Sequence, residues 1–310
     1  MIHFLSLCHP RERGDPVQSG GSVVIGNFDG VHRGHQALLQ RLKTLPGPHG
    51  VILFEPHPKE RFCGLDAAPR RIFLLADKLK WLQEQGLDYA LVIHFNQAFA
   101  QWSPAQFIEQ VLQKKVGLAQ VVVGPDFRFG AKRQGGVEDL TAAGIVVHPL
   151  EFVEDQGQKI SSTLIREALL AGQFAQAQQW LGHAYTVTGK VLHGLKRGRT
   201  LGFPTLNIGL RPNMLLAGVY AVKIRGLREQ VLLGVANIGR RPSLNPLVHP
   251  LLEVHIFDYE EEVYGRRVSI EFVAKLRDEQ KFATLAELIA QIACDVTQAK
   301  QELLCPIPSK

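Results

Sequence analysis

The stretch SVVIGNFDGVHRGHQALLQRL, residues 22–42, changes its pattern halfway along. It begins as a continuous apolar run that ends at Gly26, and it finishes with the spacing of an amphipathic helix. A glycine-rich segment with two histidines, His32 and His35, separates the two parts. A continuous β-branched run indicates a strand that is buried on both faces. The stretch therefore predicts a strand, a loop and a helix, the repeating unit of an α/β domain.

The same alternation continues to about residue 150. Ser103 before Pro104 supplies an N-cap residue followed by proline at the first helical position. Alternating strands and helices predict an α/β domain with a parallel sheet. The further apolar runs lie at 50–54, 89–95, 119–124 and 144–150, and the helical patterns are HQALLQRLKTL, LLADKLKWLQEQG, SPAQFIEQVLQKKVG and VEDLTAAG.

The second half of the chain has a different pattern. Two helices, 161–172 and 174–182, are predicted to end at glycine. Strands then follow one another without helices between them, and apolar and polar residues alternate in EVHIFD and RVSIEFV. Five or six such strands predict an antiparallel barrel. The segment 284–304 predicts a long terminal helix with Thr284 as N-cap and Glu287 at the capping-box position.

Length and composition narrow the possible classes of protein. A chain of 310 residues exceeds the roughly 100–200 residues of one domain, so two domains are expected. The net charge of +6 is spread along the chain, which suits anionic small ligands and argues against a nucleic-acid partner. The four cysteines lack CxxC or zinc-like spacing, and no apolar run approaches the ~20 residues of a membrane helix. We expect a soluble cytoplasmic protein without a membrane partner.

The glycine-rich segment GNFDGVHRGH is a candidate phosphate site. Ligands of open parallel sheets bind at the carboxyl ends of the strands. The helix that begins near Gly34 directs its free N–H groups and positive dipole end to that edge, and His32 and His35 add donors. The segment matches neither the dinucleotide fingerprint nor the GxxxxGK[ST] loop. A glycine-rich turn with two surface histidines is the alternative that this stretch alone leaves open.

Two further clusters carry phosphate or metal chemistry. ISSTLIREAL places Ser161, Ser162, Thr163 and Arg166 at a helix start, where they could bind a polyphosphate or only cap the helix and pair with neighbours. In the predicted barrel, basic side chains and loop N–H groups must bind phosphate, because no helix start is available. Within GFPTLN, Thr205 and Asn207 occupy alternate positions of a predicted strand and so share one face. Their hydroxyl and amide oxygens are suitable ligands for Mg²⁺.

The first half resembles the nucleotidyltransferase superfamily of HxGH enzymes through HxGH and ISST-x-IR. FEPHP and VVVGPDFRFG are similar to the flavin-adenylylating module of the bacterial bifunctional riboflavin kinase/FAD synthetase family. The resemblance implies in-line transfer with pyrophosphate as leaving group, with catalytic roles for His32, His35 and Arg166. It implies nucleotide-binding roles for Gly26, Asn27, Phe28, Asp29, Gly34, Ser161, Ser162 and Thr163, and flavin-binding roles for Phe54, Pro56, His57, Asp126, Phe127, Arg128 and Phe129.

Core packing is the alternative role for the two phenylalanines of DFRFG. Two positions depart from the family pattern. Gly136 stands where the family usually has Asp or Asn, and RIFLLADK replaces a Leu-Thr step before the helix near Lys78.

The second half resembles the riboflavin kinase module, whose PTAN motif is PTLN here. Leu206 is expected to point away from the metal pair. GVYAV, GVANIGRRPS, LEVHIFD and YGRRVSIEF match the same module, so the resemblance extends from about residue 23 to 299. It implies that Glu253 is the catalytic base for a primary alcohol, unless it is only a solvent-facing strand residue. The remaining implied residues are Thr205 and Asn207 for Mg²⁺, Lys196, Arg199 and Gly202 for nucleotide, and Arg277 for flavin.

The predicted protein has two enzymatic domains. Residues 1–183 form a Rossmann-like adenylyltransferase domain, and 184–310 form a kinase domain with a Greek-key-type β-barrel. The barrel would phosphorylate riboflavin to FMN with ATP and Mg²⁺, and the first domain would transfer AMP from ATP to FMN. The alternatives are another adenylyl- or cytidylyltransferase with a substrate-binding barrel, and a non-catalytic flavin-binding protein.

Overall fold

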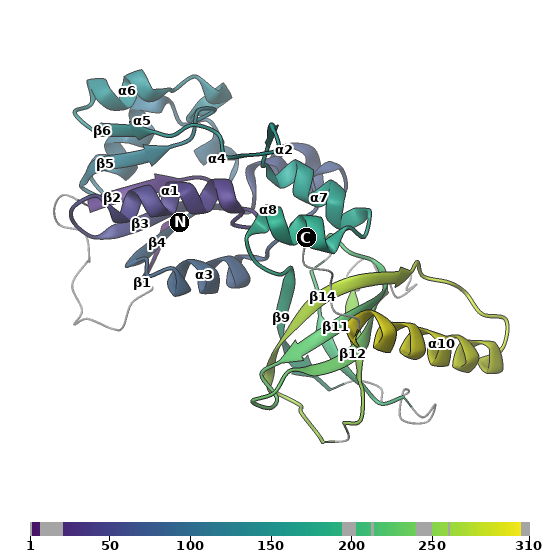
Figure 1. Cartoon of the computed structure of the whole chain (residues 1–310). Helices are drawn as coiled ribbons and strands as arrows, with labels where there is room; N and C mark the ends of the chain where they lie inside the picture. The colour runs from purple at the N-terminus through teal and green to yellow at the C-terminus, as the bar shows by residue number, and fades with distance from the viewer. Residues whose placement is uncertain are drawn as a thin grey trace. The chain divides into compact units, whose positions relative to one another are not determined.

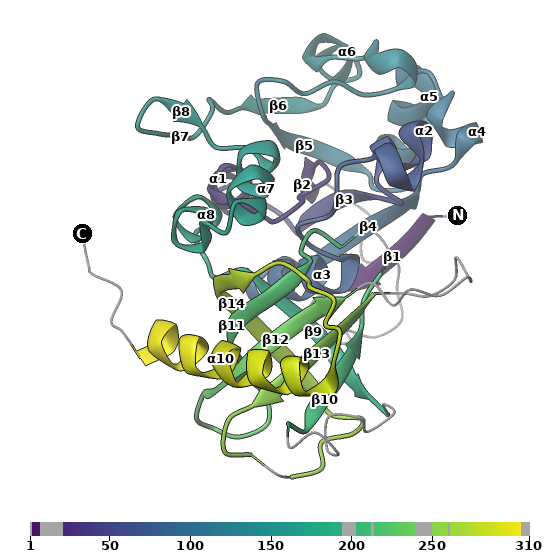
Figure 2. The same cartoon turned by 90° about the vertical axis from the view of Figure 1, so that its right-hand side faces the viewer.

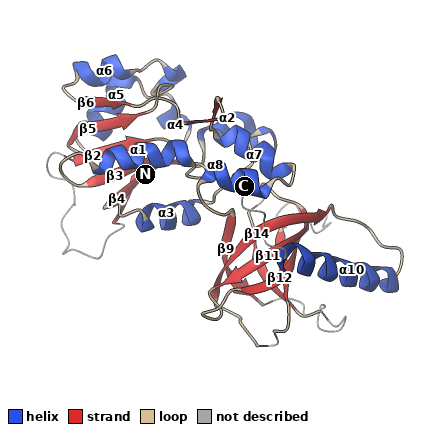
Figure 3. Cartoon of the chain, in the orientation of Figure 1, coloured by secondary structure: helices blue, strands red, loops and turns tan. Residues whose placement is uncertain are grey.

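The computed structural model describes residues 2–6, 21–193, 203–211, 214–239, 250–259 and 261–304. The chain separates into two compact units, Met1–Ser162 and Thr163–Lys310, and each is described by itself (Figure 1). Helices and strands alternate in the first unit, whereas strands predominate in the second (Figure 3). The α/β and all-β classes predicted for the two halves are confirmed. The predicted functional boundary at 183–184 stays a prediction.

The first unit is built on a six-stranded sheet in the order β1-β4-β3-β2-β5-β6. All five predicted strands are present and pair in parallel. Every residue of β2 is buried, which explains why its sequence is apolar without alternation. An antiparallel edge strand, β1 (Ile2–Ser6), was not predicted. The parallel strands are β2 (Gly21–Ile25), β3 (His49–Glu55), β4 (Tyr89–His94), β5 (Leu118–Val123) and β6 (Val146–Pro149).

Helices connect these strands largely as predicted. Ser103 caps α5 in a complete capping box with Gln106. The helix predicted to run on from there instead becomes a π-helix, η1 (Ile108–Gln113), in which Ile108, Val111 and Leu112 are buried. The other helical elements are α1 (Arg33–Lys43), α2 (Pro58–Ala67), α3 (Leu75–Glu84), α4 (Gln97–Ala100), α5 (Pro104–Phe107), η2 (Ala131–Arg133) and α6 (Val137–Ala142), and a small hairpin is formed by β7 (Glu154–Asp155) and β8 (Gln158–Lys159).

The second unit contains a closed antiparallel barrel in the order β10-β13-β12-β11-β14-β9. Two helices precede it, α7 (Ser162–Leu170) and α8 (Phe174–Leu181), and Gly182 ends α8 in the left-handed conformation as predicted. Phe174 of α8 contacts the rings of Tyr220 and Phe272 on the barrel. The strands are β9 (Thr186–Leu192), β10 (Thr205–Gly209), β11 (Gly218–Arg225), β12 (Leu232–Gly239), β13 (Leu251–Ile256) and β14 (Arg267–Arg277).

The terminal helix α10 (Leu285–Leu304) packs on the outside of the barrel (Figure 2). Its residue Ala299 is buried in a cluster with strand residues such as Val219. Thr284 accepts a hydrogen bond from the Glu287 N–H at 3.2 Å, as predicted for the N-cap. The Glu287 carboxylate instead accepts from the Ala283 N–H, one residue before the expected partner. The predicted long terminal helix is therefore confirmed, with a shifted capping contact.

Candidate functional site

Three predicted motifs of the first unit meet at one edge of the sheet. They follow the carboxyl ends of β2, β3 and β5, and β2 lies between the other two strands. The chain builds the sheet outward in both directions from β2, so this edge is a topological switch point, where open α/β sheets bind ligands. The topology thus brings together GNFDGVHRGH, FEPHP and GPDFRFG.

The loop after β2 has an uncommon backbone conformation. Phe28 and Val31 have φ values of 50° and 40°, which side chains of this bulk seldom adopt, and Gly30 has φ 82°. Both large side chains are fully buried. Such conformations persist only where the surrounding structure enforces them, and they occur often at ligand sites.

The two histidines lie stacked at the start of α1. Their ring centroids are 3.7 Å apart, and the ring of Phe28 is 4.7 Å from that of His35. A Cβ at Gly34 would lie 3.1 Å from His32 Nδ1, so glycine lets the helix start lie close to this ring. Burial, followed by the charges of His32 and Lys78, holds the pKa of His35 well below its ordinary value. His35 is therefore a neutral imidazole at neutral pH.

Two buried polar atoms beside this helix start have no hydrogen-bond partner among the described residues. They are Asn27 Oδ1 and His35 Nδ1. Buried polar atoms are rarely left unpaired, and functional sites are a common exception. The two atoms mark the loop as a place that can bind a polar ligand.

Asp29 connects the loop to two distant segments. Its carboxylate is 3% exposed and accepts hydrogen bonds from the main-chain N–H groups of Ile72 and Phe73, both at about 3 Å. Its carbonyl accepts a hydrogen bond from the Ser162 hydroxyl at 2.9 Å. Ser161 and Ser162 therefore lie beside GNFDGVHRGH, and their roles in nucleotide binding stay predictions. Thr163 and Arg166 belong to the second unit, on α7, and their roles stay predictions.

Two buried cations near the loop were missed by the sequence analysis. Lys78 on α3 is 1% exposed, and its Nζ donates a hydrogen bond to the Asn27 carbonyl. Burial lowers its pKa to about 8 against an opposing effect of Asp29. The available signal was its position four residues from both Leu74 and Leu82, on the apolar side of the helix.

Arg71, the second cation, fixes the FEPHP turn. Its guanidinium binds Glu55 at 2.9 Å and Glu60 at 2.6 Å. Glu60 accepts the main-chain N–H of His57, whose ring nitrogen in turn accepts the Lys59 N–H and caps α2. Burial lowers the pKa of His57 to about 4, so this ring is also neutral at neutral pH. The turn presents Pro56 and His57 half-buried at the edge of the sheet.

The phenylalanines of two motifs belong to one aromatic cluster. Phe129 is buried and lies 5.5 Å from Phe107, whose ring is 6.5 Å from that of Phe54. Phe127 stacks on Phe129 at 5.5 Å and is half-buried. Phe129 therefore packs in the core, whereas Phe54 and Phe127 keep exposed surface at the cluster edge.

The polar residues of DFRFG point to solvent. Asp126 pairs with Lys159, and Arg128 lies 3.8 Å from Glu138. A Cβ at Gly136 would lie 2.1 Å from Arg128 Nη1. The glycine at this position therefore leaves space that the guanidinium occupies.

In the second unit, three polar residues form a row across neighbouring strands. Asn207 on β10 is paired with Glu253 on β13, and Glu253 is paired with Asn237 on β12. Residues opposite one another in antiparallel strands project from the same face. Thr205 lies two residues before Asn207 and shares this face. Glu253 is half-buried, and the amides of Asn207 and Asn237 lie on either side of it. Asn237 was not predicted from the sequence as a member of this row.

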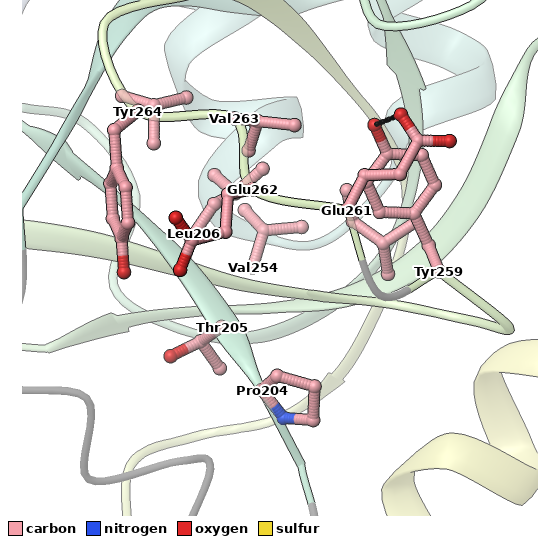
Figure 4. Close-up of a pocket in the computed structure, with 11 residues that line it drawn as sticks. Pro204, Thr205, Leu206, Val254, Tyr259, Glu261, Glu262, Val263 and Tyr264 are labelled. Atoms are coloured by element: carbon pink, nitrogen blue, oxygen red, sulfur yellow. Dashed lines mark hydrogen bonds between the residues drawn. The ribbon is translucent and has the colours of Figure 1, made fainter.

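A pocket borders the Thr205 end of this strand (Figure 4). Leu206 is buried and opposite Val254, and both line the pocket, so the leucine of PTLN contributes to its apolar wall. Glu261 and Glu262 line its acidic side. Lys196, Arg199 and Gly202, which were predicted to bind nucleotide, lie outside the described residues.

Arg277 has a defined partner in the second unit. Its Nε and Nη2 each donate to a carboxylate oxygen of Asp295 at 2.8 Å. Asp295 lies on α10 and also accepts from Gln291. The predicted flavin-binding arginine thus ties the terminal helix to β14.

No group of three or more His, Cys, Asp or Glu side chains within the described ranges is arranged to hold a metal ion. In the same part of the chain, no helix is both long and apolar enough to cross a membrane.

Comparison with known proteins identifies the two units. The family model for FAD synthetase matches residues 15–164, and the model for riboflavin kinase matches 181–303. The bifunctional riboflavin kinase/FMN adenylyltransferase of Escherichia coli K12 is 44% identical over 296 residues, which cover 92% of this chain and 93% of the relative. The chain belongs to this family. The predicted family and the order of its FAD synthetase and riboflavin kinase domains are confirmed.

Other relatives extend the similarity over both domains. The Haemophilus influenzae bifunctional riboflavin kinase/FMN adenylyltransferase is 43% identical and covers 92% of this chain and 94% of its own length. A crystal structure described as a macrolide-efflux protein from Streptococcus pneumoniae has a TM-score of 0.75 and 30% identity, with 94% of this chain and 96% of that chain covered.

Proposed function

We propose that this chain phosphorylates riboflavin to FMN in its kinase domain and transfers AMP from ATP to FMN in its FAD synthetase domain. The observation that carries the proposal is the pairing of two complementary sites on one chain. One presents a half-buried carboxylate between two amides, which suits activation of an alcohol. The other presents a helix start and a glycine-rich loop, which suit phosphate binding. The product of the first site supplies the phosphate that attacks at the second.

In the kinase step, Glu253 accepts the proton of the riboflavin primary alcohol as the oxygen attacks the γ-phosphate of ATP. The hydroxyl of Thr205 and the amide oxygen of Asn207 share one strand face and are suitable ligands for Mg²⁺. Held there, Mg²⁺ would supply positive charge to offset the negative charge of the transferring phosphoryl group. Arg277, which Asp295 of α10 holds in place, contacts the flavin, and Asn237 completes the polar row beside the base.

In the adenylyl step, the FMN phosphate attacks the α-phosphate of ATP and pyrophosphate leaves. The FMN phosphate is already a nucleophile, so the site needs positioning and charge stabilisation rather than a base. The α1 N–H groups, His32 and His35 stabilise the phosphates, and His35 does so as a neutral hydrogen-bond donor. Arg166 and Thr163 bind the polyphosphate, and Phe54, Phe127 and the FEPHP turn contact the flavin. The cytoplasmic location and the lack of a nucleic-acid partner stay predictions.

A product time course with the full chain, riboflavin, ATP and Mg²⁺ tests the proposal. We expect FMN to appear first and FAD to follow, with ADP and then pyrophosphate released in step. Adenylylation or cytidylylation of a different substrate without FMN formation would favour the other nucleotidyltransferase function. Tight flavin binding without release of ADP or pyrophosphate would favour a binding protein. Chelation of Mg²⁺ should stop FMN formation.

A further inference from the structure

The FAD synthetase domain contains a fully buried lysine that the proposed mechanism does not use. Lys78 lies on α3, and its ammonium donates to the main-chain carbonyl of Asn27. The contact spans 51 positions of the sequence. A lysine is seldom fully buried unless it is paired, because removing its charge from water is costly. Its retention in the apolar side of α3 therefore needs an explanation beyond helix packing.

The carbonyl that Lys78 binds belongs to the phosphate loop. Asn27 is followed by Phe28, Gly30 and Val31, all with positive φ, and then by His32 at the start of α1. The side-chain oxygen of Asn27 is itself buried and lacks a partner in the described part of the chain. The ammonium thus holds the base of a strained loop, at the residue whose side-chain oxygen is available to a ligand.

We propose that Lys78 is a positioning residue for adenylyl transfer, which fixes the Asn27 carbonyl and so the loop that presents Asn27, His32 and His35 to the nucleotide. The inference rests on the proposed function of this domain. In this role the charge of Lys78 stabilises the loop and does not contact the substrate. Asp29 holds the same loop from another side through Ile72 and Phe73. The loop is therefore fixed on both sides of Phe28.

The charged groups around Lys78 come from several elements. Asp29 of the loop, Glu55 at the end of β3 and Glu60 of α2 favour its ammonium, whereas Arg71 opposes it. Burial is the main cause of the lowered pKa of His35 and of His57, and the charge of Lys78 lowers both further. Its own pKa, lowered to about 8 chiefly by burial, places loss of the ammonium within an accessible pH range.

The signs of the pH effects on activity and stability are opposite. Between pH 8 and 10.5 the unfolded chain holds a proton on Lys78 that the folded chain has released, so this group's contribution to stability increases with pH. Over the same range a neutral amine replaces the ammonium and donates a weaker hydrogen bond to the Asn27 carbonyl, so the positioning weakens. Above pH 8, deprotonation of Lys78 should therefore decrease the rate of FAD formation while it increases the free energy of unfolding.

Three variants of the full-length enzyme test the inference. Lys78→Met keeps the side-chain length but removes the donor and charge, Lys78→Arg keeps both, and Lys80→Met is the matched control. Lys80 lies on the same helix but is exposed and only 3.7 Å from Glu84 in a surface pair. We measure FAD formation from FMN and ATP between pH 7 and 10, with riboflavin phosphorylation in the same samples as the reference.

We expect Lys78→Met to lower kcat for FAD formation by ~100-fold, the scale of a misplaced binding group, and to leave riboflavin phosphorylation unchanged. Lys80→Met should change either rate by no more than about twofold, as is usual for a surface substitution. Lys78→Arg should recover part of the loss and lack the decline above pH 8, because a guanidinium stays charged.

Wild-type-like FAD formation in Lys78→Met would overturn the inference. If Lys78→Met loses both activities, the pH profile of Lys78→Arg decides, and an unchanged decline above pH 8 overturns the inference. Failure of the wild type itself to convert FMN to FAD would overturn the proposed function and this inference together.

Discussion

In the proposed mechanism, the two domains act on ATP through different parts of the polypeptide. The FAD synthetase domain offers main-chain groups of a glycine-rich loop and a helix start, because a parallel sheet leaves both at one edge. The barrel offers the side chains of Thr205, Asn207 and Glu253 from adjacent strands. The first site therefore depends on the buried groups that hold its loop, and the second on the individual residues of one row.

The largest expected effect tests the barrel side of this comparison. Glu253→Gln removes the base but keeps the size of the side chain, so riboflavin phosphorylation should fall by ~10²–10⁴-fold. FAD formation from supplied FMN should be unchanged. Initial rates of both reactions measure this, with the exposed Glu229→Gln as control. Equal loss of both activities in a folded variant would contradict two separate sites.

His35 tests the other side. His35→Ala should lower FAD formation by ~10²-fold, the effect of removing one preorganised donor, and spare FMN formation. Because its pKa lies well below the ordinary value, His35 stays neutral above pH 6.5, and its role should not weaken between pH 6.5 and 7.5. His35→Gln, a neutral donor, should retain more activity than alanine. The exposed His94→Ala is the control, and equal rates for the Gln and Ala variants would refute donation by His35.

The Arg277–Asp295 ion pair tests a residue pair that stabilises the second unit and takes no part in the chemical step. Both side chains are largely buried, and Asp295→Asn leaves the guanidinium without its charged partner. The free energy of unfolding should fall by ~3 kcal/mol, typical of a broken buried pair. Thermal denaturation of the full chain measures this against Glu302→Gln, an exposed change on the same helix. An unchanged unfolding temperature would show that the pair contributes little to stability.

The smallest expected effect concerns acid stability of the FAD synthetase domain. The pKa of His57 is about 4 when folded and 6.5 in its ordinary state, mainly because of burial. The unfolded chain therefore binds the extra proton between these values, and stability falls as the pH decreases from 6.5 to 4. His57→Gln should make this pH dependence shallower in urea denaturation. An identical slope in the variant would mean that His57 is not the responsible group.

The strands could be predicted because the order of apolar and polar residues along each strand reflects which of its residues are buried. β2 is buried throughout and reads as a continuous apolar run, whereas β13 alternates buried and half-buried residues. Strand pairing was not predictable, and so neither was Asn237 beside Glu253, which depends on the register of β12 with β13. The motifs of both sites were found from the sequence through their resemblance to a family. Lys78 and Arg71 were missed because their partners lie 51 and up to 16 positions away, a matter of tertiary packing.

Asp29 joins parts of the chain that are made at different times during synthesis. Its carboxylate binds main chain 43 and 44 positions later, and its carbonyl binds a side chain 133 positions later. Domains fold as units while the chain emerges from its N-terminus. A nascent chain cannot complete these contacts before Ser162 leaves the ribosome, and it needs no later residue for them. These three contacts of the loop after β2 can therefore form while the kinase barrel is still being translated.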